Sequence, residues 1–127
     1  MSEPPTRDPV LQAAADAHRG TLMERLGLEW MELTPDRVVA RLPVDGNRQP
    51  YGLLHGGATA ALIETIGSFG ATLGASADRQ ILGVQLSVNH LRPVRDGWIT
   101  GTGTPVHSGR TTAVWDVRVE DDGGRLV

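Results

Sequence analysis

The stretch Gln49–Gly70, QPYGLLHGGATAALIETIGSFG, decides how this chain must fold. Between Arg48 and Asp78 the only formally charged side chain is Glu64. A run this long and apolar exceeds the length of one strand and is typical of a buried helix, which we predict over Gly57–Gly74. Burial of an ionised carboxylate without partners is unfavourable, so Glu64 in such a helix needs an explanation.

Two simple explanations of Glu64 stay open: the side chain points to solvent through a gap, or it pairs with a distant arginine. The residues at the start of the helix favour a functional role, because the glycines of His55-Gly56-Gly57 let backbone N–H groups approach a ligand. The first N–H groups of a helix lack partners within it and lie at the positive end of its dipole. They would stabilise a carbonyl oxygen on which negative charge develops. Ser68 shares the face of Glu64, four residues further on.

The remaining sequence predicts one helix before the central one and several antiparallel strands. The first helix is predicted from Pro9 to about Leu26, where Gly27 would end it. Alternating or turn-bounded apolar residues predict strands over 28–33, 37–44, 80–91, 97–106 and 110–120, followed by a hairpin turn at DDGG. The fold class expected is α+β, with a curved antiparallel sheet wrapped around one long central helix.

Composition limits the classes of function. The 127 residues suit a single domain over 1–127, with residues 1–8 as a loose tail. The absence of cysteine excludes disulfides, thiolate metal sites and cysteine nucleophiles, and fits a cytoplasmic setting. The net charge is −3 and the arginines are scattered, which argues against nucleic-acid binding. The N-terminus has no signal-peptide core, and the hydroxyl and small residues of Gly56–Ala77 argue against a membrane span.

The segment NRQPYGLLHGGATAALIETIGS closely resembles the active-site segment of hotdog-fold acyl-CoA thioesterases of the PaaI-like group. The likeness continues in LGLEWMEL, VNHLRPVRDG and PVHSGRTTAVWDV, so it covers roughly residues 20 to 126. The branch it resembles contains the 1,4-dihydroxy-2-naphthoyl-CoA thioesterases and the Arthrobacter-type 4-hydroxybenzoyl-CoA thioesterases. The combined spacing of Gln, His-Gly-Gly and Glu is the specific part of the match. The resemblance implies hydrolysis of an acyl-CoA thioester, aromatic in type, to the free acid and CoA.

The resemblance also implies a role for each matching residue. Glu64 corresponds to the catalytic carboxylate, as nucleophile or as general base on water, and the Gly56 N–H to the group that polarises the thioester carbonyl. Gln49 would position the thioester or the water, His55 would assist near the thioester, and Ser68 would orient the carboxylate or water. The residues expected to contact CoA or the acyl group are Gly57, Gly83, His90, Leu91, Arg92, His107, Ser108, Gly109, Arg110, Thr111 and Thr112.

The same resemblance implies no cofactor, since CoA is part of the substrate, and no metal; four scattered histidines do not form a ligand set. The family's sites are shared across a homodimer, and its dimers often pair into tetramers. Its members usually continue past the hairpin with one more strand, rich in Arg and Thr. The sequence given ends at Val127, so two alternatives stay open: the sequence is truncated, or the sheet lacks that strand.

Alternatives remain for several residues and for the function. Arg92, Arg95 and Arg110 would be solvated loop charges without the family match, Ser68 could bond back to the helix backbone, and 107–109 could be a simple turn. A non-catalytic acyl-CoA-binding or sensor module is the second functional hypothesis, and a structural oligomer the third. The acyl group, and nucleophilic against general-base catalysis by Glu64, stay open.

Overall fold

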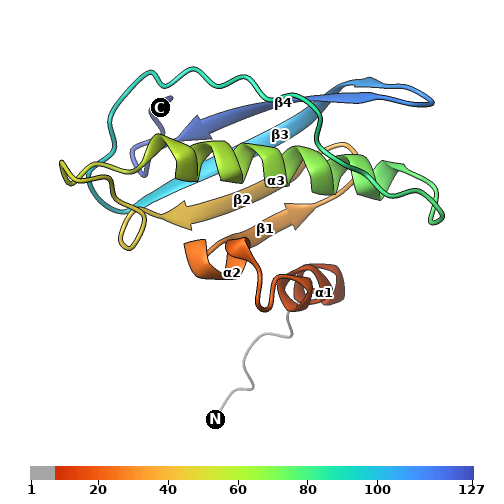
Figure 1. Ribbon diagram of the computed structural model, residues 1–127, viewed down its shortest axis with the longest axis horizontal. Helices are drawn as coiled ribbons and strands as arrows, with labels where there is room; N and C mark the ends of the chain where they lie inside the picture. The colour runs from red at the N-terminus through yellow and green to blue at the C-terminus, as the bar shows by residue number, and fades with distance from the viewer. Residues whose placement is uncertain (1–7) are drawn as a thin grey trace, which may run out of the picture.

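The sheet of this protein contains four antiparallel strands in sequence order, β1-β2-β3-β4, within residues 8–127, which the computed structural model describes. The strands are β1 (Glu29–Leu33), β2 (Val38–Pro43), β3 (Trp98–Ser108) and β4 (Ala113–Glu120). One long helix, α3 (Gly56–Gly74), crosses one face of the sheet (Figure 1). The expected α+β hotdog architecture is therefore confirmed. The predicted loose tail, residues 1–8, lies outside the described residues except for Asp8.

The core lies between α3 and the sheet. Val38, Ala40 and Leu42 of β2 are fully buried, as their alternation predicts. The sheet-facing residues of α3 are Ala58, Thr59, Leu62, Ile66 and Gly70. Ile66 packs directly on β3, where a methyl group added at Gly101 would lie 2.7 Å from its Cδ1 atom. Glycine in this part of β3 therefore lets the helix approach the sheet closely.

The predicted single N-terminal helix is wrong, because the structure has two: α1 (Pro9–Ala17) and α2 (Leu22–Leu26). The break contains Gly20 in the left-handed region, at φ +75°. The two helices keep a continuous apolar periodicity because both face the same part of the core, so periodicity alone misses the break. Gly27, at φ +80°, ends α2 as predicted.

The predicted strand over 80–91 is also wrong. Residues 80–90 are extended, but within the described chain their backbone forms no hydrogen bonds to a neighbouring strand. Leu82 and Val84 are 74% and 93% exposed. The first backbone bonds come at Leu91 and Arg92, whose N–H groups both donate to the carbonyl of Val127. An alternating pattern favours a strand only where another backbone is present to pair with it.

An aromatic cluster joins the N-terminal helices to the rest of the fold. His18 stacks on Trp30 at 5.4 Å between ring centroids, and Phe69 of α3 lies 4.6 Å from Trp30. His18 is only 8% exposed, and neither its Nε2 atom nor Nε1 of Trp30 has a hydrogen-bond partner among residues 8–127. Burial lowers the pKa of His18, because the charged imidazolium loses its hydration.

This burial predicts a pH-dependent stability. Between the model-peptide pKa of 6.5 and the lowered pKa of folded His18, the unfolded chain binds a proton that the folded chain does not. The free energy of unfolding should therefore fall as the pH falls through this window, by at most about 1.4 kcal/mol per pH unit. Denaturant unfolding across this pH range measures the slope. His18→Phe is the matched control, since it keeps a ring against Trp30; an unchanged slope in that variant would assign the effect to another group.

Candidate active site

The first turn of α3 leaves one backbone donor available. His55 caps the helix: its Nδ1 atom accepts from the N–H of Gly57 at 2.7 Å, and its carbonyl accepts from the N–H of Ala58 at 3.0 Å. The N–H of Gly56 has no acceptor among residues 8–127. At the positive end of the helix dipole, this N–H is suited to bind a carbonyl oxygen. The N–H of Gly57 is occupied by His55, and a contact between Gly57 and the substrate stays a prediction.

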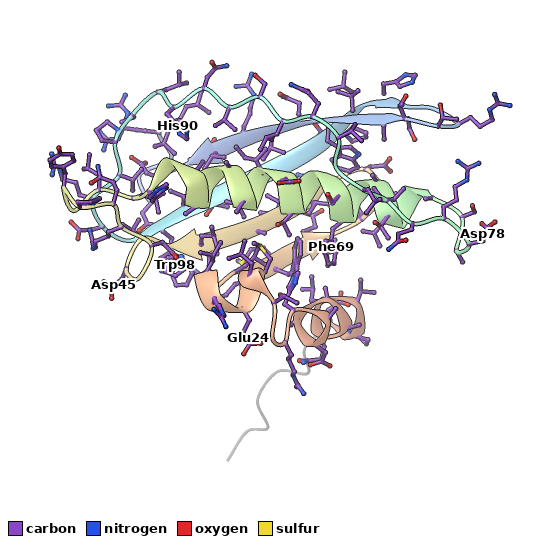
Figure 2. All side chains as sticks on the ribbon, in the orientation of Figure 1. Glu24, Asp45, Phe69, Asp78, His90 and Trp98 are labelled. Atoms are coloured by element: carbon purple, nitrogen blue, oxygen red, sulfur yellow. The ribbon has the colours of Figure 1, made fainter. Side chains whose placement is uncertain are left out.

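Other predicted residues surround this end of the helix. The imidazole of His90 packs on Gly56, where an added methyl group would lie 2.9 Å from Nε2 (Figure 2). Gln49 lies in the preceding loop; its N–H donates to the carbonyl of Leu53 at 2.7 Å, and its side-chain oxygen accepts from the N–H of Tyr51. His55, Gly56 and His90 thus form the first group of site residues, whereas the contacts of Gln49 lie within its own loop.

The second group lies in a pocket of about 610 Å³ further along the helix. Its floor is α3, and its walls are the extended segment after the helix and the β3–β4 hairpin. The predicted residues that line it are Glu64, Ser68, Gly83, Ser108, Gly109, Arg110, Thr111 and Thr112. Segments far apart in sequence therefore meet here, as the resemblance implies.

Glu64 is exposed in the chain, which agrees with the first of the two simple explanations left open, a side chain that points to solvent. The sheet covers only one side of α3, and Glu64 projects from another. Its carboxylate has no hydrogen-bond or ion-pair partner within the described residues, so pairing with a distant arginine is not observed. A methyl group added at Gly83 would lie 2.8 Å from Oε1 of Glu64, so the segment after the helix passes directly beside this carboxylate.

Ser68 is half-buried on the pocket side of α3. In α3, the hydroxyl of Thr65 donates to the backbone carbonyl of Ala61, and the hydroxyl of Thr72 donates to the backbone carbonyl of Ser68. The Ser68 hydroxyl forms no such bond in the part of the chain described. It is available next to Glu64, one helical turn away.

The two groups are too far apart to act on one atom within a single chain. Gly56 and Glu64 are eight residues apart on α3, a rise of about 12 Å. A nucleophile and the donor to the carbonyl it attacks must both lie about 3 Å from the reacting group. Within one chain, the Gly56 N–H and the Glu64 carboxylate therefore do not converge on one reacting atom.

The remaining predicted residues lie elsewhere. Arg92 and Arg95 line a shallow groove with acidic residues of the chain end, away from Glu64. The ring of His107 lies beside Gly109 but does not line the pocket. Sequence reasoning missed Arg79, which lines the pocket and whose guanidinium donates to the carbonyl of Arg110. No local motif marks Arg79, since its partner is far along the chain.

Among the described residues, no three His, Asp or Glu side chains are grouped so that they could hold a metal ion. None of the helices described is long and apolar enough to cross a bilayer.

Comparison with known proteins identifies the family. Residues 51–127 match the thioesterase superfamily. The chain is 40% identical over 120 residues to the proofreading thioesterase EntH of Cronobacter turicensis, covering 94% of this chain and 88% of the relative. It is 34% identical over 118 residues to the 1,4-dihydroxy-2-naphthoyl-CoA hydrolase of Escherichia coli, covering 92% and 87%. A solved thioesterase of Haemophilus influenzae matches with a TM-score of 0.88 at 35% identity, covering 91% of this chain and 82% of that one.

The chain belongs to the thioesterase superfamily, and it is a thioesterase with the hotdog fold. The family expected from the sequence is thereby confirmed.

Proposed function

We propose that this thioesterase hydrolyses an aromatic acyl-CoA thioester to the free acid and CoA. The proposal is carried by two groups on α3 that have no hydrogen-bond partner among residues 8–127: the Gly56 N–H and the Glu64 carboxylate. Thioester hydrolysis needs a donor to the carbonyl oxygen and a nucleophile or base, and these two groups supply both.

In the proposed reaction the Gly56 N–H donates to the carbonyl oxygen and stabilises the negative charge that develops on it. Glu64 attacks the carbonyl carbon, or removes a proton from the water that attacks it. The carbon–sulfur bond then breaks, and the thiolate leaves and takes up a proton. If Glu64 attacks, water hydrolyses the resulting anhydride; both routes yield one acid and one thiol. Ser68, which lines the same pocket as Glu64, would orient the carboxylate or the water.

The separation of about 12 Å between the two groups supports a site shared by two chains. Two copies with antiparallel α3 helices, related by a two-fold axis, would place Glu64 of each beside Gly56 of the other. The proposed assembly is a homodimer with two equivalent sites, which can pair into a tetramer. Glu64, exposed in one chain, would be covered at that interface.

An aromatic acyl group is supported by the pocket walls near Glu64, which include Ile63, Leu82, Leu86 and Trp115. Flat rings pack well on such apolar side chains. One relative is a hydrolase of an aromatic acyl-CoA, 1,4-dihydroxy-2-naphthoyl-CoA. Hydroxybenzoyl, dihydroxynaphthoyl and phenylacetyl groups are the candidates.

A cytoplasmic location stays a prediction.

The test is thiol release from matched aryl- and alkyl-CoA thioesters. We expect hydrolysis of at least one aryl-CoA, with a kcat/KM at least tenfold above that for the alkyl-CoA thioesters. Preference for alkyl groups would overturn the aromatic assignment and keep the hydrolase. A folded protein that binds acyl-CoA without releasing thiol would instead support the binding-module hypothesis.

A further inference from the structure

The loop before α3 is held by one buried side-chain amide, that of Asn47. Asn47 is only 8% exposed. Its Nδ2 group donates to two backbone carbonyls, that of Leu26 at 2.7 Å and that of Pro43 at 2.8 Å. These carbonyls belong to the last residue of α2 and the last residue of β2. The amide therefore uses both of its donor hydrogens to tie the loop to the ends of two elements.

The backbone of Asn47 extends this connection to the start of α3. Its carbonyl accepts from the N–H of His55 at 2.9 Å. His55 is the residue that caps α3, through its Nδ1 atom to Gly57 and its carbonyl to Ala58. A continuous series of hydrogen bonds therefore runs from the ends of α2 and β2, through Asn47 and His55, to the first turn of α3.

These bonds set the direction of the Gly56 N–H. The peptide between His55 and Gly56 is planar and trans, so its N–H points opposite to its carbonyl. The His55 carbonyl points into the helix, toward the N–H of Ala58 at 3.0 Å. The Gly56 N–H therefore points away from the body of the helix. A donor stabilises an oxyanion only when it is aimed at that oxygen, so the groups that hold this peptide also hold the donor.

We infer that Asn47 is a positioning residue, which holds the peptide between His55 and Gly56 so that the Gly56 N–H faces the thioester carbonyl. The inference rests on the proposed function, since it takes this N–H as the donor to the oxyanion. Asn47 is buried and does not line the pocket that contains Glu64, so it acts through its bond to the His55 N–H.

The experiment is a double-mutant cycle on thioester hydrolysis with Asn47→Ala and Gly56→Pro, the second of which lacks the N–H. We expect Asn47→Ala alone to lower kcat about tenfold and to change KM less than about twofold, because the donor acts on charge that develops in the transition state. In the Gly56→Pro background the same change should lower kcat less than about twofold, since the donor is already absent.

Thr34→Ala is the matched control for the cycle. The Thr34 hydroxyl also donates to a backbone carbonyl, that of Arg37 at 3.0 Å, but it does so in the turn between β1 and β2. The parent kcat is expected for this variant. If Asn47→Ala does not fold, Asn47→Ser takes its place in the same cycle, because serine keeps one donor.

Two kinetic outcomes would overturn the inference. An equal fall of kcat in the parent and Gly56→Pro backgrounds would make Asn47 a structural residue only, because a loss that does not pass through the Gly56 N–H adds independently. An unchanged kcat in Asn47→Ala would exclude Asn47 from positioning the donor.

Amide hydrogen exchange tests the positioning without any activity. We expect Asn47→Ala to speed exchange at the N–H groups of His55, Gly57 and Ala58 about tenfold more than at Ile66, in the middle of α3. Equal acceleration at all four would show a general loss of stability and overturn the inference. If the parent protein hydrolyses no thioester, the proposed function fails, and these exchange rates then decide whether Asn47 holds the start of the helix.

Discussion

Glu64→Gln is expected to lower kcat/KM for thioester hydrolysis by about 10²- to 10⁴-fold. The amide has the shape of the carboxylate, but it is neither a nucleophile nor a base. Glu64 is exposed and has no protein partner among residues 8–127, so the fold should keep its stability. Thiol release measures the rate, and thermal unfolding measures the stability.

The control for this variant is Glu120→Gln. Glu120 is also exposed, lies at the end of β4, and does not line the pocket, so parent activity is expected. A Glu64→Gln protein that hydrolyses its thioester at the parent rate would remove Glu64 from the mechanism.

Gly56→Pro removes the backbone N–H donor and leaves the side chains of Glu64, His55 and the other site residues unchanged. Proline has no N–H and is favoured at the first position of a helix. His55, at φ −68° and ψ 128°, already has the extended backbone that a residue before proline adopts. We expect kcat to fall by about 10²- to 10³-fold, the loss typical of one donor to a developing oxyanion.

Gly56→Ala is the matched control. Alanine adds the same Cβ atom, which must displace the ring of His90, but keeps the N–H. The difference in kcat between the proline and alanine variants therefore isolates the hydrogen bond. Equal rates in the two would show that contact with His90, and not the N–H, controls activity.

The two inactive variants together test the shared site. A mixed dimer of Glu64→Gln and Gly56→Pro chains would contain one site with both changes and one with neither. If each site uses Glu64 of one chain and Gly56 of the other, co-expression should restore activity up to about half that of the parent per mixed dimer. Activity that stays lost in isolated mixed dimers would place both groups in the same chain and contradict the proposal.

Local patterns predicted most of the fold. The central helix was expected over Gly57–Gly74 and begins one residue earlier, because its apolar run and its glycines are local signals. The strands beside it follow from alternation. The segment 80–91 and the break at Gly20 were missed, since both depend on which backbone or core lies nearby, and no local pattern records that.

The candidate site, like the fold, was predicted only in part from the sequence. The resemblance selected Glu64, Ser68 and the residues of 108–112, and the structure brings them into one pocket. A solvent-facing Glu64 was one of two explanations that the sequence left open, because apolar composition does not tell which face of a helix the sheet covers. Arg79 was missed because it reaches the pocket through a contact with Arg110, 31 residues away.

The cap of α3 also fixes the tautomer of His55. Its Nδ1 atom accepts a hydrogen bond from Gly57, so the neutral ring carries its proton on Nε2. In this state the exposed nitrogen donates and cannot accept. His55 can hold a carbonyl or carboxylate oxygen of the substrate, but it cannot take a proton from water while it caps the helix. Of Glu64 and His55, only the Glu64 carboxylate is therefore free to accept a proton.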